Sequence, residues 1–245
     1  MNTINIETTV GEIVRAIPAR SRIFENLGID YCCGGKKPLV DVCRQKGLDP
    51  ATVAAMLSAM DDSPLATLAN PEEMSLSELC DHIEEFHHAY LREELPRLDF
   101  MTRKVAAVHG DHEPRLLAVR RVFEAFNAEM TSHTKEEDEQ IFPAIRKLES
   151  ANNDKTKTSA NLKDSFSKLE SEHDIAGAAL AHFKDLTDSY TPPDWACNTF
   201  RALYDGLGKL EQNTHQHVHK ENNVLFPRAL AFRGSQHLPS PPCSR

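Results

Sequence analysis

Two short segments that lie far apart in the chain share one pattern of residues able to bind a metal ion. The first has His133 and Glu137, followed by Ile-Phe-Pro at 141–143. The second has His217 and Glu221, followed by Leu-Phe-Pro at 225–227. Residues four apart on a helix lie on one face, so each copy presents an imidazole and a carboxylate in the same direction. Two such faces that meet inside a helical bundle would form a metal site.

The elements that must position these residues are four long helical patterns, with no strand-like alternation among them. The first begins at the capping-box sequence Ser75-Leu76-Ser77-Glu78. The others are expected over 114–148, over 162–186 and from 192 to about 232, with a polar loop over 152–158. This order predicts an all-α fold, an up-down-up-down four-helix bundle with its second and fourth helices diagonal.

In such a bundle the first and third helices are expected to supply the remaining ligands. The third helix carries His173 and His182, of which His173 lies beside Glu170 and Glu172 in an apolar context. The first helix carries the adjacent pair His87 and His88, and the spacing leaves open which of the two binds. Four histidines and two carboxylates suit two ions of iron, manganese or zinc. Two bridging glutamates would leave open coordination positions for a small ligand such as O2, NO or peroxide.

A smaller helical unit is expected over residues 1–60, with four short helices and a turn at 30–38 that contains Cys32 and Cys33. Nearby lysines and glycines favour accessible thiols with a lowered pKa, although two partly buried structural cysteines are an equal alternative. Residues 61–74 are rich in helix breakers, which predicts a linker between the two units. The bundle then covers 75–232, and a tail rich in proline and serine over 233–245 is expected to be disordered.

Composition excludes several classes of protein. The net charge of −9 argues against non-specific nucleic-acid binding, and no apolar stretch is long enough to span a membrane. The first residues lack the pattern of a secretory signal, and the six cysteines do not form a disulfide framework, so we expect a cytoplasmic protein. The oligomeric state stays open between a monomer and a homodimer.

Three longer sequence blocks carry a resemblance to a known family. They are Asp-Tyr-Cys-Cys-Gly-Gly at 30–35, Glu-Ser-Glu-His-Asp at 170–174 and Glu-Asn-Asn-Val-Leu-Phe-Pro-Arg-Ala at 221–229. With the repeated motif, they resemble the iron–sulphur cluster repair proteins, the di-iron "repair of iron centres" family of the YtfE, ScdA and DnrN type, which is related to haemerythrin. The resemblance covers residues from about 8 to 230.

The resemblance implies a non-haem di-iron centre with an oxo-type bridge in a cytoplasmic protein. Its partners would be iron–sulphur proteins damaged by nitrosative or oxidative stress. It would restore their clusters by supplying iron, by handling NO, or by both. The family's cysteines fall on Cys32 and Cys33, as candidates for thiol exchange. Whether the di-iron centre turns over NO as an enzyme is left open. The family's ligands fall on His88, His133, Glu137, His173, His217 and Glu221.

The main alternative is a haemerythrin-like module that binds or senses O2 or NO without turnover. The haemerythrin pattern has a second histidine four residues after His173, where this chain has Gly177. The missing imidazole and the dithiol unit both favour the repair function. Glu172 and His82 are expected to support the ligands from outside the coordination sphere. We expect no metal ligand among the remaining candidates, which are Glu85, His109, His112, Glu170, His215, His219 and His237.

Overall fold

The computed structural model describes residues 4–60, 70–150 and 155–232. Within these ranges the regular elements are helices, and the single β-contact is a bridge between Thr9 and Pro38. The predicted all-α fold is therefore confirmed. No helix among the described residues is long and apolar enough to cross a membrane.

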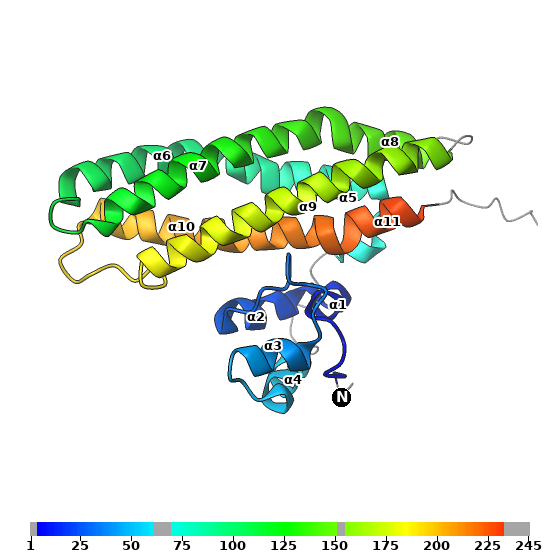
Figure 1. Ribbon diagram of the computed structural model, residues 1–245, viewed down its shortest axis with the longest axis horizontal. Helices are drawn as coiled ribbons and strands as arrows, with labels where there is room; N and C mark the ends of the chain where they lie inside the picture. Colours follow the sequence, from blue (N-terminus) through cyan, green and yellow to red (C-terminus); the bar gives the residue numbers. More distant parts are fainter. Residues whose placement is uncertain (1–3, 61–69, 151–154, 233–245) are drawn as a thin grey trace, which may run out of the picture.

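The N-terminal unit consists of four short helices, shown beneath the bundle in Figure 1. Thr9 and Glu12 form a capping box that starts the first of them, and Gly28 ends the second with a φ of 61°, a left-handed conformation that suits glycine. The apolar faces of all four helices enclose one small core. The helices are α1 (Val10–Ala16), α2 (Ser21–Leu27), α3 (Leu39–Gln45) and α4 (Pro50–Ser58), with a 3₁₀ turn at Pro18–Arg20 between the first two.

Four long rods make the bundle, and three of them are interrupted by a π-helical segment. The first rod is α5 (Leu76–His82), a π segment (Ile83–His88) and α6 (Ala89–His109). The second is α7 (Arg115–Glu136), a π segment (Glu137–Ile141) and α8 (Phe142–Ser150). The third is α9 (Lys155–Leu186), and the fourth is α10 (Asn198–Lys220), a π segment (Glu221–Leu225) and α11 (Phe226–Ala231).

Neighbouring rods pack in the order expected of an up-down-up-down bundle. Helix α6 packs against α7 and α10, and α9 packs against the same two helices (Figure 1). The second and fourth rods are therefore diagonal, as the sequence predicted. This arrangement turns their two His-x3-Glu faces toward each other across the bundle axis.

Two predicted helix boundaries are wrong. The third rod begins at Lys155, so residues 155–158 are helical rather than part of a loop. The fourth begins at Asn198 rather than at Pro192, because Ala196 closes a turn onto Pro193 and Cys197 is extended. The predicted linker is described only from residue 70 on, where Pro71–Glu73 form a 3₁₀ turn. Residues 61–69 and the predicted tail lie outside the described residues.

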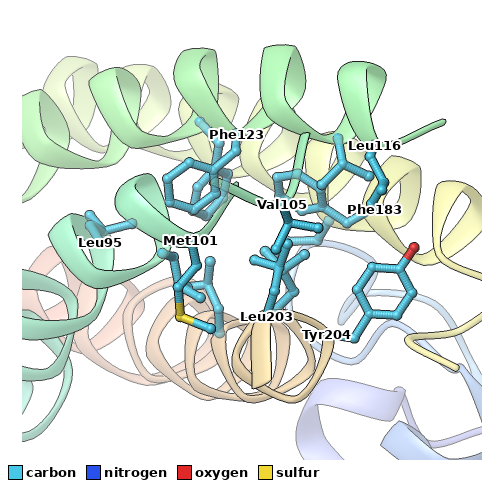
Figure 2. Packing of buried hydrophobic residues seen from close by; sticks show 14 of the residues in the cluster. Leu95, Met101, Val105, Leu116, Phe123, Phe183, Leu203 and Tyr204 are labelled. Atoms are coloured by element: carbon cyan, nitrogen blue, oxygen red, sulfur yellow. The ribbon is translucent and has the colours of Figure 1, made fainter. Parts of the chain in front are cut away.

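The bundle has two apolar clusters, one toward each end. The larger lies among α6, α7, α9 and α10, and Figure 2 shows Phe123 and Phe183 packed beside Val105 and Leu203 within it. The smaller lies among α5, α8, α11 and the first half of α9. Along each rod, the predicted ligand residues fall between the stretches that enter these two clusters. The bundle therefore encloses a polar layer between two apolar cores.

Candidate metal centre

The structure brings the six predicted ligands together in this polar layer. All six side chains are buried, and both glutamates are fully inaccessible to solvent. Each of the four rods contributes, so the site depends on the complete bundle. The residues are His88, His133, Glu137, His173, His217 and Glu221.

The donor atoms form two groups that share both glutamates. One group has His88 and His217, whose Nε2 atoms are 3.1 Å apart, and the other has His133 and His173, whose Nε2 atoms are 3.0 Å apart. Glu221 places Oε1 2.9 Å from His217 Nε2 and Oε2 3.2 Å from His173 Nε2.

Glu137 divides its oxygens in the same way. Its Oε2 lies 3.3 Å from His88 Nε2, and its Oε1 lies 3.3 Å from His133 Nε2. A carboxylate with one oxygen in each group has the geometry of a bridging ligand. Each group then offers two imidazole nitrogens and two carboxylate oxygens, all within 4.8 Å of one another.

Unpartnered atoms inside this layer show that the residues fit metal ions. Within the described part of the chain, both oxygens of Glu137 and Oε2 of Glu221 are buried without a hydrogen-bond partner. A buried carboxylate oxygen left in that state is costly, because it has lost its water. A divalent or trivalent cation in each group would satisfy these oxygens and the paired Nε2 atoms together.

Electrostatics in the metal-free protein favour the same conclusion. Burial alone would raise the pKa of Glu137, but the neighbouring imidazoles outweigh it and lower the pKa. Burial opposes protonation of His88 and His133, yet the carboxylates raise their pKa values to about 9 and about 10. Burial lowers the pKa of His217 well below its usual value. The layer thus holds two ionised glutamates and accumulates positive charge beside them.

Three of the four ligand histidines are oriented through their outer nitrogen. The Nδ1 atom of His88 lies 2.6 Å from Asp138 Oδ1, and that of His173 lies 2.8 Å from Asn222 Oδ1. Such contacts fix the tautomer and ring orientation of a metal ligand. The sequence analysis missed Asp138 and Asn222, although each directly follows one of the motif glutamates.

Glu172 supports a metal ligand, as expected, but this ligand is His133 and not its sequence neighbour His173. Its Oε2 lies 2.8 Å from Nδ1 of His133 on α7. His217 has no such partner for Nδ1 among the described residues, and its ring instead stacks on His87 at 5.4 Å with an interplanar angle of 5°.

The Phe-Pro pair after each motif directly follows two of the three π-helical segments, whereas Ile83–His88 is followed by Ala89 and Tyr90. Phe142 and Phe226 donate their backbone N–H to the carbonyls of Glu137 and Glu221, five residues earlier. The next residue in each copy is Pro143 or Pro227, which has no N–H and would clash with a carbonyl four residues back. A π turn relieves this conflict, and such turns are frequent at functional sites.

Of the adjacent pair on the first rod, His88 points into the centre and His87 points away from it. His87 Nε2 lies 2.6 Å from Lys220 Nζ, and its Nδ1 lies 3.2 Å from Asn213 Oδ1. His82 contacts His87 and Phe86, so it reaches the ligands only through the ring of His87. Its predicted support is therefore indirect.

The remaining candidate residues lie outside the two ligand groups. Glu85 is exposed, and Glu170 forms an ion pair with Lys36 at 3.4 Å. His215 and His219 both pack against Tyr31 of the N-terminal unit. His109 and His112 contact Trp195 at the far end of the bundle, and His237 lies outside the described residues.

The Cys-Cys-Gly-Gly turn packs directly on the bundle beside the centre. Cys33 Sγ lies 3.4 Å from the carbonyl oxygen of His173, and a Cβ added at Gly177 would lie 3.7 Å from the same sulfur. The expectation of two accessible thiols with lowered pKa is wrong for Cys32, which is buried. The hydrogen bond with Cys33, burial and Asp30 together raise the pKa of its thiol. Cys33 is half-buried and lines a cleft of about 620 Å³.

Comparison with known proteins agrees with this architecture. Residues 81–229 match the family model described as "Hemerythrin HHE cation binding domain", and residues 6–61 match a "Domain of Unknown function (DUF542)". The chain is 35% identical over 222 residues to the iron-sulfur cluster repair protein YtfE of Escherichia coli O157:H7, across 91% of this chain and 96% of that relative. It is 36% identical to the protein of the same name from Enterobacter sp. (strain 638), with the same coverage.

These matches confirm the resemblance noted in the sequence. The haemerythrin-type match spans more than half of the chain, and the relatives are matched over nearly their full length. The chain belongs to the family of YtfE-type iron–sulfur cluster repair proteins, with a haemerythrin HHE cation-binding domain behind a small N-terminal domain.

Proposed function

We propose that this protein holds two iron ions and takes part in the repair of iron–sulfur clusters damaged by nitrosative or oxidative stress. The observation that carries the proposal is the division of Glu137 and Glu221 between two pairs of histidines. One ion would bind among His88, His217 and one oxygen of each glutamate. The other would bind among His133, His173 and the remaining oxygens.

The ligand count supports chemistry at the ions as well as storage. Each group offers four donors, and iron commonly takes six ligands, so an oxo-type bridge and a small ligand such as NO or O2 can be accommodated. Bound iron would supply redox chemistry and a labile metal that can be donated. The protein's own residues hold the ions, orient the imidazoles and separate them from water with apolar layers on both sides.

Damaged iron–sulfur proteins are the proposed partners, by similarity with the relatives whose names state cluster repair. The cytoplasm is the proposed location, where such partners are made. Cys33 is the proposed point of exchange, because its sulfur touches the backbone of the ligand His173 and faces the cleft of about 620 Å³. Cys32, buried beneath it, would hold the turn in place.

The alternative is a module that binds O2 or NO without further reaction. The surroundings of Gly177 favour repair over this alternative, since the position has no second histidine and the thiol of Cys33 lies 3.7 Å from where a Cβ would be. The N-terminal unit therefore places a thiol beside the position where the haemerythrin pattern has its second imidazole. Its thiol would have no task in simple O2 carriage.

Metal content and the visible spectrum of the full-length protein test the proposal. We expect about two irons per chain and an oxo-bridged spectrum that changes when NO is added. A reversible O2 adduct with no response to NO would favour the sensing module. Zinc, or no metal, in protein purified from iron-replete cells would overturn the di-iron centre.

A second experiment tests the thiols. Cys33→Ser should retain iron, because no ligand is removed, but should restore the activity of an NO-damaged iron–sulfur enzyme more slowly. Cys43→Ser is a matched control, since Cys43 lies in the core of the N-terminal unit, away from the bundle. Equal repair by Cys33→Ser and wild type would assign the thiol a structural role.

A further inference from the structure

A second cavity between the N-terminal unit and the bundle has a charge pattern that the metal centre does not explain. It has a volume of about 510 Å³, which lies within the usual range for small-molecule sites. Its walls come from α1, α2 and the Pro18–Arg20 turn on one side and from the π segment Ile83–His88 and α10 on the other. It shares no lining residue with the cleft beside Cys33.

All charged side chains that line this cavity are basic. They are Arg15, Arg22 and Lys220, and no aspartate or glutamate lines it. This stands out in a chain with a net charge of −9. Arg15 pairs with Glu72 at 3.2 Å, whereas neither Arg22 nor Lys220 forms an ion pair with a carboxylate among the described residues.

Lys220 is the most informative of these groups, because it is half-buried and forms no ion pair with a carboxylate among the described residues. Its Nζ donates to Nε2 of His87, which leaves Nδ1–H of His87 to donate to Oδ1 of Asn213. A lysine ammonium has three donors, and this contact uses one. Its other two donors have no carboxylate within ion-pair distance in the described part of the chain, so an anion that reached Lys220 would be held by a charge-assisted hydrogen bond.

The cavity also has an apolar part. Val14 and Pro18 of the N-terminal unit and Phe86 of the bundle contribute to it. Arg22 is exposed and stands at the solvent side. A ligand with a charged head and a compact apolar body would match both parts.

We propose that this cavity is a binding site for a small organic anion, whose carboxylate or phosphate group pairs with Lys220 and, more weakly, with Arg22, and whose apolar body packs on Val14, Pro18 and Phe86. The site lies at the contact between the two domains, so its ligand would touch both. Through the ring of His87, which stacks on His217 at 5.4 Å, the ligand would also lie one side chain from the metal centre.

Isothermal titration of the iron-loaded, full-length protein with three matched probes tests the proposal. Benzoate and phenyl phosphate carry the two head groups on one ring, and benzyl alcohol is the neutral control. We expect one or both anions to bind at least about tenfold more tightly than benzyl alcohol, and their order identifies the preferred head group. Lys220→Met should weaken binding of the preferred anion by about tenfold or more, and Arg22→Gln by a smaller factor.

Lys209→Met is the matched control, because Lys209 lies on the same helix but pairs with Asp205 at 2.7 Å outside the cavity. It should bind the anion as the wild type does. Anions that bind no better than benzyl alcohol, or that bind Lys220→Met with wild-type affinity, would overturn the proposal. If Lys220→Met fails to fold or to hold iron, the Arg22→Gln variant decides, because Arg22 is remote from the metal ligands. An Arg22→Gln variant that binds the anion with wild-type affinity would then overturn the proposal.

Discussion

Single residues of the metal centre each have two tasks, one at the centre and one outside it. His133 offers Nε2 to the centre and Nδ1 to Glu172, and His173 offers the same two atoms to the centre and to Asn222. The outer contact selects the tautomer that leaves Nε2 free to bind a metal. His217 is the exception, because ring stacking replaces its outer hydrogen bond.

Removal of one imidazole should cost the protein much of its iron. We expect His217→Ala to bind fewer than about half the ions of the wild type, because the variant loses a direct donor at a buried site. The matched control is His215→Ala, on the same helix but packed against Tyr31. Iron analysis of both purified variants provides the measurement. Full occupancy in the double variant His133→Ala/His217→Ala would refute the ligand assignment.

Metal uptake should also release protons. In the metal-free protein His88 and His133 have pKa values of about 9 and about 10, so both are protonated at pH 7 and must become neutral to bind a metal. We expect release of about two protons per chain from these residues on loading at pH 7. Calorimetry in buffers of different ionisation enthalpy measures this number. Release of less than about one proton would mean that the two imidazoles are already neutral in the apo-protein.

At the scale of the elements, π-helical segments and caps set the positions of the ligands. Glu137 and Glu221 both stand at the junction between an α-helix and a π turn, where the backbone is wider than in a regular helix. In both copies a proline follows the π turn, at Pro143 and Pro227. The carboxylates are thus positioned by backbone geometry as well as by side-chain packing.

Replacement of one of these prolines should affect metal binding without removing a ligand. Pro227→Ala restores an N–H that can donate to the carbonyl four residues earlier, which favours a regular α-helix over the π turn. We expect iron affinity to fall by about tenfold, as for other changes outside the coordination sphere. Pro96→Ala, within the regular helix α6, is the control and should leave affinity unchanged. A chelator competition assay compares the two.

Glu149 of α8 caps the start of α5, and this contact gives a pH-dependent contribution to stability. Its two oxygens each accept a backbone N–H at 2.9 Å, from Leu76 and Ser77. Burial alone would raise the pKa of Glu149, but the Ser77 and Leu76 hydrogen bonds outweigh it and the pKa is lowered. The contribution is therefore complete above the unfolded-state pKa of about 4.3 and is lost as the pH falls through the lower folded-state pKa.

We expect Glu149→Gln to reduce the free energy of unfolding by about 1 kcal/mol at pH 7. The difference from the wild type should shrink as the pH falls below about 4, where the carboxyl of the wild type becomes protonated. Urea unfolding of the two proteins at several pH values measures it. Glu129→Gln, an exposed glutamate on α7, should change little at any pH. A difference that persisted unchanged at low pH would contradict the ionised cap.

At the scale of the whole molecule, the N-terminal unit docks through small residues that allow close approach. Asn223 donates to the carbonyl oxygen of Cys32 at 3.1 Å, and its side chain lies against Gly11 and Gly35. A Cβ at Gly35 would come within 2.6 Å of Asn223 Oδ1 and 2.7 Å of the Tyr31 carbonyl oxygen. The second of these contacts is with backbone, which cannot easily move aside.

Gly35→Ala should therefore loosen the docked turn and expose Cys33. We expect alkylation of Cys33 by iodoacetamide to become several-fold faster, as followed by mass spectrometry, while the bundle keeps its iron. Gly208→Ala is the control, because its added Cβ would make only ordinary contacts, at 3.4 Å or more, with Tyr190. Equal alkylation rates in Gly35→Ala and wild type would show that the turn tolerates the methyl group.

The sequence by itself determined the class of the fold and the chemistry of the site. The His-x3-Glu spacing places two donors on one helical face whatever the surroundings are, and the apolar periodicity of four long segments predicts a bundle with those faces inward. Caps also follow from local chemistry, as Thr9, Gly28 and Ser75 show. Each of these features depends on residues within a few positions of one another.

The tertiary structure decided what depends on contacts between distant segments. Adjacent histidines look alike in the sequence, and only the packing of the first rod turns His88 inward and His87 toward Lys220. The partner of Glu172 proved to be His133, 39 positions away and on another helix. Burial of Cys32 reversed its expected exposure, because the π segment Glu221–Leu225, whose Asn223 donates to the Cys32 carbonyl oxygen, is far from the cysteine in the sequence. Local spacing determines the direction in which a side chain leaves its own helix. Which residues it then contacts across the bundle depends on how the rods pack.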